Sequence, residues 1–518
     1  PLAIMVHSLD HAAKIAELNE VERRILVSSA NPILLVTRKK ECPLPRSLTW
    51  RVATVGLFLP TTPLHEWLLR ATDGPLVVTS GNVHDDPMHT CDEELDDAVS
   101  AGALDGILTH DRPIVRAVDD GVVRVISGQA VPFRIGRGFA PLPLPAIERW
   151  AASKNCPPML AVGGHQKVAV ALWNGSQAVL SQHLGDMSSP SSRGRFREIV
   201  DDLRRLYQLD RAQVVCDQHP DYFTSRWADN LGEKSCRVQH HHAHAVSCMV
   251  DNDLLDREVL AFTWDGTGLG AAGELWGGET LIASVNHCSR SHSLLPFELL
   301  GGEAAIHEPA RVSLALLARA AGKEAIIGDD KLLSRLGFNR REAETLLRLR
   351  TSVNHSPRTS SMGRLFDGVA GLLLGVREVS YEGEAAAWLE SEAETGEETT
   401  PFSMPTESGP VSQGDWRPMV RQMLEAVRRG DKASDLANRF HATLARWARD
   451  AASHHDQIDV VLTGGCFQNR LLSEWMIEEL AGLGRHVYLH RELPPNDGGL
   501  AVGQLAIAIG LSSRTEFA

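Results

Sequence analysis

The sequence predicts an α/β protein built from several compact units. Short apolar runs of strand length repeatedly end in glycine or polar turns, as at residues 32–37, 54–60, 159–164 and 460–465. Runs with helical periodicity lie between them. At 518 residues, the chain is long enough for about three or four such units.

Composition narrows the classes of protein that fit. The hydrophobic fraction of 43% and the charged fraction of 23% are ordinary for a globular chain. No apolar run approaches the roughly 20 residues of a membrane span, and the first residues do not read as a leader but as a truncated end. The formal charge of −14 argues against a broad nucleic-acid surface. The eight cysteines are scattered without a Cys-x-x-Cys pair, which favours the reducing cytoplasm.

Residues 1–142 read as one α/β unit. The apolar run 75–79 is typical of a buried strand and leads into the polar turn Ser80-Gly81-Asn82. Arg134 and Arg137 follow further on, and guanidinium groups near strand ends suit phosphate or carboxylate. Each of these features is also compatible with an ordinary turn or a solvated charged face.

Residues 143–158 are punctuated by prolines and predict a linker. The next block, 159–293, opens with a strand, a Gly163-Gly164 turn and a hairpin at Asn174-Gly175. A strand, a glycine turn and a hairpin in this order are typical of the start of each half of an actin/sugar-kinase/Hsp70-like fold. Lys167, just before the hairpin, could reach a phosphate, although the segment lacks the spacing of a P-loop.

The segment 238–245 carries the strongest chemical signal. Four histidines fall within five positions, and His240 and His244 have the i, i+4 spacing that places two side chains on one helical face. Neutral imidazole is a common metal ligand. The apolar run 259–264 then delivers Asp265 into a predicted glycine-rich turn at 266–270. A surface histidine cluster or one buried histidine is the alternative.

Residues 294–518 predict the second half of the fold. A helix with an apolar stripe begins near Ser361 and carries Asp367, and residues 390–415 predict a surface insertion. The strand at 460–463 opens into Gly464-Gly465, bare backbone against which an adenosine could lie. Asp497 lies in an Asn-Asp-Gly-Gly turn that is good loop chemistry without any ligand, but it could also complete a site of two histidines and two aspartates.

Taken together in chain order, several motifs resemble the HypF carbamoyltransferase family of [NiFe] hydrogenase maturation. They are Thr79–Asn82, His110–Ile114, Ser181–Asp186, Gln239–His244, Asp265–Gly268, Trp276–Glu279, Ser361–Asp367, Tyr381–Ala385 and Pro495–Gly499. The resemblance implies an incomplete YrdC-like twisted-sheet domain followed by a two-lobed actin/Hsp70-like (ASKHA) domain of the TsaD type. It also implies a cytoplasmic, ATP-dependent enzyme that activates carbamoyl phosphate as carbamoyl-adenylate and transfers the carbamoyl group to the C-terminal cysteine of HypE.

The same resemblance assigns residues to sites. It implies one Fe or Zn ion held by His240, His244, Asp265 and Asp497, and catalysis involving Lys167, His240 and Asp265. ATP with Mg would be bound by residues in both domains: Ser80, Asn82, Arg137, Lys167, Asp367, Gly464, Gly465 and Asn469.

The chain also departs from the family. The acylphosphatase-like domain and zinc fingers with which members begin are not in this sequence, so hydrolysis of carbamoyl phosphate is not expected here. Gly121 stands where Ser is usual, which puts adenylate formation in question. The alternatives are a threonylcarbamoyl transferase of tRNA modification, an O-carbamoyltransferase, and a weakly catalytic maturation scaffold.

Overall fold

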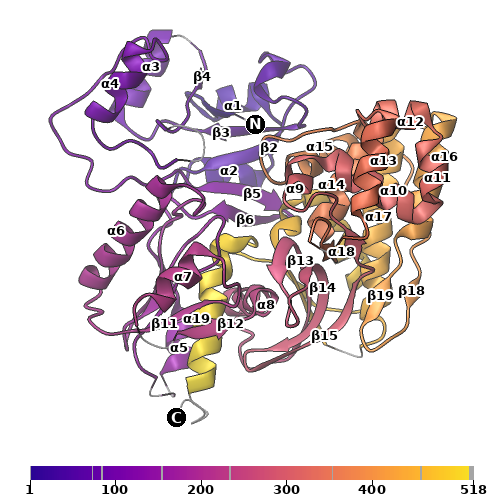
Figure 1. Ribbon diagram of the computed structural model, residues 1–518. Helices are drawn as coiled ribbons and strands as arrows, with labels where there is room; N and C mark the ends of the chain where they lie inside the picture. Colours follow the sequence, from indigo (N-terminus) through magenta and orange to yellow (C-terminus); the bar gives the residue numbers. More distant parts are fainter. Residues whose placement is uncertain are drawn as a thin grey trace.

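A computed structural model describes residues 2–72, 74–82, 86–152, 154, 156–232, 235–352, 354–455 and 458–512. Three sheets organise these residues (Figure 1). No helix among them combines the length and hydropathy needed to cross a membrane.

The first sheet has six strands and belongs to the N-terminal part of the chain. Its strands are β1 (Ala3–Met5), β2 (Ile33–Thr37), β3 (Thr54–Phe58), β4 (Leu76–Val77), β5 (Val122–Ile126) and β6 (Gln129–Arg134), in the order β4-β1-β3-β2-β5-β6. Four helices and a 3₁₀ turn accompany them: α1 (Leu9–Ile15), α2 (Glu20–Leu26), η1 (Arg46–Leu48), α3 (Pro63–Thr72) and α4 (Glu93–Ser100). The run at 75–79 was expected to be a buried strand, but β4 is a two-residue edge strand and Val77 is exposed.

The second sheet follows at once. Its strands are β7 (Leu142–Pro143), β8 (Met159–Ala161), β9 (Ala171–Trp173), β10 (Ala178–Leu180), β11 (Gln213–Asp217) and β12 (Cys236–Val238), in the order β12-β11-β8-β9-β10-β7. β9 and β10 pair as the antiparallel hairpin that Asn174-Gly175 predicts. Helices α6 (Pro190–Leu206) and α7 (Phe223–Asp229) pack on one face of this sheet.

The predicted linker at 143–158 is instead partly structured. β7 pairs with β10, and α5 (Pro145–Ala151) buries Ile147 and Ala151 against the second sheet. The prolines do not exclude a helix here, because Pro145 occupies the first turn of α5, where a missing N–H costs no hydrogen bond.

The third sheet has nine strands. They are β13 (Val259–Leu269), β14 (Leu275–Ser284), β15 (His287–Leu294), β16 (Phe297–Glu298), β17 (Arg358–Thr359), β18 (Thr406–Glu407), β19 (Ser412–Gly414), β20 (Asp459–Thr463) and β21 (Val487–Tyr488). The main path is β18-β19-β15-β14-β13-β20-β21, and β17 joins β16 to β14. The sheet begins at Val259, before the predicted boundary between residues 293 and 294, so β13, β14 and β15 belong to it.

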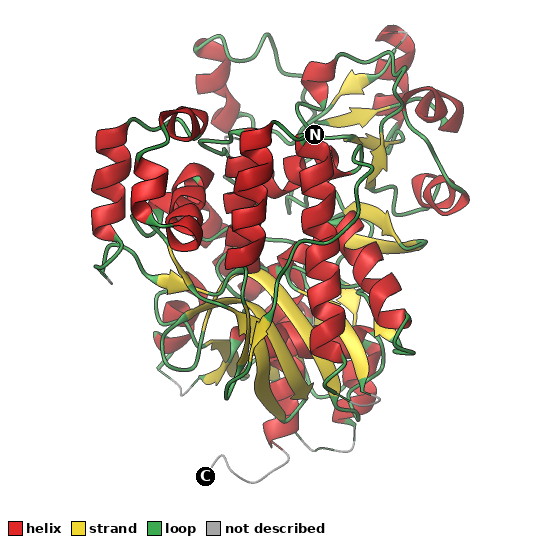
Figure 2. Cartoon of the chain, turned by 90° about the vertical axis from the view of Figure 1, so that its right-hand side faces the viewer, coloured by secondary structure: helices red, strands yellow, loops and turns green. Residues whose placement is uncertain are grey.

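Helices cover the outer face of the third sheet, as Figure 2 shows. They are α9 (Ala304–His307), α10 (Pro309–Ala321), α11 (Lys323–Ile327), α12 (Asp330–Arg335), α13 (Arg340–Leu349), α14 (Met362–Leu374), α15 (Glu384–Ala393), α16 (Arg417–Arg429), α17 (Ala433–Ala452) and α18 (Arg470–Ala481). The predicted surface insertion at 390–415 includes the end of α15, where Glu390 is buried, and strands β18 and β19. The polar composition of this segment does not reveal that Glu390 is buried, because its charge is paired with the buried Arg124.

Two helices lie between the second and third sheets. α8 (His240–Asp251) and α19 (Leu500–Ser512) pack against each other and share one apolar core with strands of both sheets. α19 lies against β8, β9 and β11 of the second sheet, although it is the last helix that the structure describes. Two sheets around a central helix pair confirm the predicted actin/Hsp70-like architecture.

Candidate metal and nucleotide site

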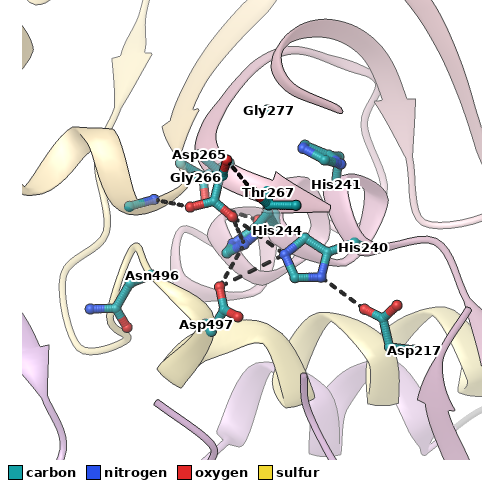
Figure 3. A network of polar contacts seen from close by, with 12 residues as sticks. Asp217, His240, His241, His244, Asp265, Gly266, Thr267, Gly277, Asn496 and Asp497 are labelled. Atoms are coloured by element: carbon teal, nitrogen blue, oxygen red, sulfur yellow. Dashed lines mark hydrogen bonds and ion pairs between the residues drawn. The ribbon is translucent and has the colours of Figure 1, made fainter. Parts of the chain in front are cut away.

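Helix α8 presents two histidines to one point between the sheets (Figure 3). The helix starts at His240 because the Gln239 side chain accepts a hydrogen bond from the His242 N–H and so caps the first turn. His240 and His244 lie one turn apart, and both side chains are almost completely buried. A buried imidazole requires a partner for its ring nitrogens.

Asp265 approaches these histidines from β13. The predicted turn at 266–270 is corrected: β13 continues to Leu269, with an irregular register between Trp264 and Gly268. Asp265 is oriented by the Gly465 N–H, which donates to Asp265 Oδ1 at 2.9 Å, so that Oδ2 faces the two imidazoles.

Asp497 comes from the other end of the chain, in the 3₁₀ turn η3 (Asp497–Gly499). The loop before it is held by the C-terminal end of α8, because Asp251 accepts hydrogen bonds from the backbone N–H groups of Arg491, Glu492 and Leu493. The helix that carries the histidines thus also positions the segment that carries Asp497.

The four side chains have the spacing of a metal ligand set. His244 Nε2 is 3.4 Å from both Asp265 Oδ2 and Asp497 Oδ1, and His240 Nε2 is 3.4 and 3.7 Å from the same two oxygens. A tetrahedral ion with ligands at about 2.0–2.1 Å separates them by about 3.3–3.4 Å. These separations are long for hydrogen bonds, and His244 Nε2 is buried with no hydrogen-bond partner. The donor set therefore fits a divalent cation.

The pKa shifts of His240 and Asp265 also favour a bound cation at the cluster. Burial alone would lower the pKa of His240, but the carboxylates of Asp217 and Asp497 outweigh it and raise this pKa above its usual value. Burial would raise the pKa of Asp265, but the adjacent imidazoles of His240 and His244 hold it well below its usual value instead. The carboxylates thus attract positive charge to this point, which a divalent ion can supply in place of protons.

Asp217 completes the surroundings of His240. It ends β11 and lies 2.8 Å from His240 Nδ1, with both side chains fully buried. A carboxylate on this nitrogen fixes the ring orientation and leaves Nε2 free to face the cluster.

A second group of charges lies beside the cluster. Lys167 Nζ is 3.5 Å from Glu382 Oε2, and Glu382 Oε1 is 3.0 Å from Arg364 Nη2. Arg364 Nη1 is in turn 2.8 Å from Asp367 Oδ2. Burial would lower the pKa of Lys167, but Glu382, Asp497 and Asp186 raise it, so this amine stays charged. Burial raises the pKa of Asp367 to about 6, although Arg364 lowers it.

The glycines expected to hold a nucleotide lie next to the cluster. Gly464 has φ of +101°, and a Cβ there would overlap the Trp264 carbonyl group. Gly465 is the residue that donates to Asp265. The side chain of Asn469 is engaged structurally, because it caps α18 through the Leu472 N–H and contacts His441 Nε2 at 2.9 Å.

Ser80, Asn82 and Arg137 lie in the first domain. Ser80 is exposed in its turn and hydrogen-bonds Asn82. Arg137 is paired with Asp120 at 2.8 Å and also donates to the Asn31 carbonyl. At Gly121 a Cβ would overlap the Phe139 ring, which explains why this position suits glycine here.

The sequence did not single out four residues that the structure places at the site: Asp217, Arg364, Glu382 and Gln504. The Gln504 side chain binds both the N–H and the carbonyl of Gly163, at 2.9 and 3.1 Å. One signal for it was present, because Gln504 interrupts an otherwise apolar C-terminal helix. Asp217 had a similar signal as the polar end of a buried strand.

Two lobes around a central helix pair define a protein of the actin/Hsp70-like class, and a His/Asp cluster lies beside its glycine turns. Residues 154–251 match the family described as HypF Kae1-like domain, and residues 261–504 match the one described as Carbamoyltransferase, Kae1-like Domain, second subdomain. Residues 1–136 match the Sua5/yciO/yrdC family, described as Telomere recombination.

Individual relatives agree with these matches. The chain is 36% identical over 524 residues to Carbamoyltransferase HypF of Synechocystis, covering 98% of this chain and 67% of the relative. It is 36% identical to Carbamoyltransferase HypF of Rhodobacter capsulatus, covering 98% of this chain and 66% of that protein. The chain belongs to the HypF carbamoyltransferase family, as its motifs predict, and spans about two thirds of these relatives.

Solved structures confirm the fold. A full-length HypF crystallised in a phosphate- and nucleotide-bound form superposes with a TM-score of 0.91 at 31% identity, covering 99% of this chain and 79% of that one. HypF of T. kodakarensis superposes with a TM-score of 0.89 at 28% identity, covering 99% and 68%.

Proposed function

We propose that this chain is a carbamoyltransferase of hydrogenase maturation, which passes a carbamoyl group from carbamoyl-adenylate to the thiol of a C-terminal cysteine on a HypE-type acceptor protein. ATP and carbamoyl phosphate are the sources of the adenylate. The observation that carries this proposal is the convergence of His240, His244, Asp265 and Asp497 beside Gly464 and Gly465. Membership of the HypF family and the nucleotide-bound relative support it.

The four residues of the cluster would hold one Fe or Zn ion, since imidazole and carboxylate ligands suit either metal. When bound, the ion would supply Lewis-acid polarisation of the carbamoyl oxygen. The chain's own cations act on the nucleotide. Lys167 and Arg364 offer charged donors for phosphate oxygens, and the bare backbone at Gly464–Gly465 allows close approach.

The position of the site suits attack by a thiol. Lys167 comes from the first lobe of the Kae1-like domain, and Arg364 and Gly465 come from the second, so a nucleotide between them is held from both sides. Fixing donor and acceptor in one place converts an encounter into a positioned reaction.

The eight cysteines are all free, which fits a reducing cytoplasm.

Two assays test the proposal separately. ATP–pyrophosphate exchange that depends on carbamoyl phosphate tests adenylate formation. Supplying carbamoyl-adenylate with a peptide that ends in cysteine, and detecting the carbamoylated thiol by mass spectrometry, tests transfer. We expect transfer in the wild type and its loss in Lys167→Met. Absence of transfer from the metal-loaded wild type would contradict the proposal, and retained acceptor binding without either activity would favour a scaffold.

A further inference from the structure

The hairpin of β5 and β6 in the first domain lies against the loops that carry the site in the Kae1-like domain (Figure 1). The Ser127 N–H donates to Glu474 Oε1 at 3.0 Å, and Gln129 Nε2 donates to the His490 carbonyl at 2.7 Å. The hairpin therefore contacts two segments that lie far from it in sequence. One follows the Gly464–Gly465 turn, and the other leads to Asp497.

Arg124 in β5 makes the most buried of these contacts. Its Nη1 is 2.9 Å from Glu390 Oε1 and 3.2 Å from the Gln468 carbonyl oxygen, and both charged side chains are only 8% exposed. Glu390 also accepts from the Arg470 N–H at 2.9 Å, in the first turn of α18. The Arg124–Glu390 pair thus holds the segment between the Gly464–Gly465 turn and α18 through one backbone carbonyl and one backbone N–H.

Asn496 makes the second contact, directly beside a residue of the cluster. Its Oδ1 accepts from the Gly498 N–H at 2.9 Å, and its Nδ2 donates to the Phe133 carbonyl of β6 at 3.0 Å. Asn496 is 2% exposed. The hydrogen bond that Asn496 donates to β6 consequently fixes the turn in which Asp497 presents its carboxylate.

We propose that the β5–β6 hairpin is a structural part of the transfer site. Arg124 positions the Gly464–Gly465 turn, and Asn496 positions Asp497. The first domain would then set the geometry of the His/Asp cluster in the Kae1-like domain, in addition to binding any ligand of its own. This inference rests on the proposed function for its kinetic consequence only, because the metal affinity of the cluster can be measured without any reaction.

The test uses the full chain with Co²⁺ as the probe metal. Asn496→Ser keeps a hydroxyl able to accept from the Gly498 N–H but is too short to reach Phe133. We expect it to weaken Co²⁺ binding by at least about tenfold, as is usual for groups that orient ligands, and to change the visible absorption spectrum of the bound ion. Arg116→Met is the control, because it breaks the contact of Arg116 with Asp202 in α6, and neither residue belongs to the segments that carry the His/Asp cluster or the Gly464–Gly465 turn.

Arg124→Met tests whether Arg124 positions the Gly464–Gly465 turn, and Arg124→Lys tests whether another cation restores the lost activity. If the proposed function holds, Arg124→Met lowers kcat for transfer at least about tenfold with the KM for the acceptor unchanged, and lysine restores part of the loss. If the wild type has no transfer activity, the proposed function fails while the Co²⁺ measurements still decide this inference. Wild-type Co²⁺ affinity and spectrum in Asn496→Ser would overturn it, including when Arg124→Met does not fold.

Discussion

Asp217 shows how one residue outside the cluster determines what the cluster can do. It touches no predicted metal ligand except His240, and there it holds the nitrogen that faces away from the other three residues. The ring cannot turn without removing the imidazole partner of Oδ2 in this fully buried carboxylate. The orientation of His240 is therefore fixed by the end of β11, in the other sheet of the domain.

Replacing Asp217 by Asn is expected to weaken metal binding. The amide oxygen can still accept from the His219 N–H, as Asp217 Oδ1 does now, but the charge beside His240 is lost. We expect the dissociation constant of the metal to rise 10- to 100-fold, in the range of about 10–100 for such partners. Competition with a chelator measures it, and Asp221→Asn, whose partner is the exposed Arg226, should bind like the wild type.

The raised pKa of Asp367 predicts that the stability of the protein depends on pH. Burial raises its pKa to about 6 in the folded protein, against about 3.9 in an unfolded chain. Between these values the folded state holds the extra proton, so the contribution of this carboxyl to stability is complete below about pH 4 and is lost as the pH rises through about 6.

Asp367→Asn removes this titration. The unfolding free energy of the wild type minus that of the variant should fall by about 3 kcal/mol between about pH 4 and pH 7, since a shift of about two units corresponds to that much. Denaturant unfolding at several pH values measures the difference. A difference independent of pH would show that Asp367 is ionised throughout.

At the scale of elements, the site depends on α19 as much as on α8. α19 is apolar except at Gln504 and at its last residue, Ser512, and the Gln504 amide binds both the N–H and the carbonyl of Gly163. Gly163 has φ of +70° and starts the turn that leads to Lys167. Gly164 follows it and lies against the cluster, where a Cβ would be 3.1 Å from Asp497 Oδ2. The last helix thus holds the first glycine turn of the domain.

Gln504→Met, similar in shape but without the amide, leaves a buried N–H and carbonyl of Gly163 unpaired. Each unsatisfied group costs about 1–3 kcal/mol, so we expect a lower thermal midpoint and weaker nucleotide binding. Differential scanning calorimetry and nucleotide titration measure these effects. Ser512→Ala at the end of α19 is the control, and equal midpoints for Gln504→Met and the control would refute this role.

For the whole molecule, the order of the motifs along the chain was enough to predict the family and the actin/Hsp70-like fold. The assignment of the His/Asp cluster as a metal ligand set stays a prediction. His240 and His244 were predictable because helical spacing is local, and Asp265 because it ends an apolar run. Asp497 could be joined to them only through the family resemblance, since no local rule relates residues more than 200 positions apart.

The errors have a common physical origin. Composition suggested a linker at 143–158 and a surface insertion at 390–415, but β7, α5, Glu390 and β19 form contacts with distant segments. Glu382 and Arg364 were missed for the same reason, because their pairing across the site follows from packing that a single sequence does not encode locally.

The most direct test of this account is elemental analysis of the purified protein and two histidine variants. We predict that the wild type carries a stoichiometric amount of iron or zinc, and that His244→Ala loses it. His242→Gln, on the same helix but bonded to the Ser284 carbonyl, should retain it. Full metal content in His244→Ala, or equal loss in both variants, would contradict the account.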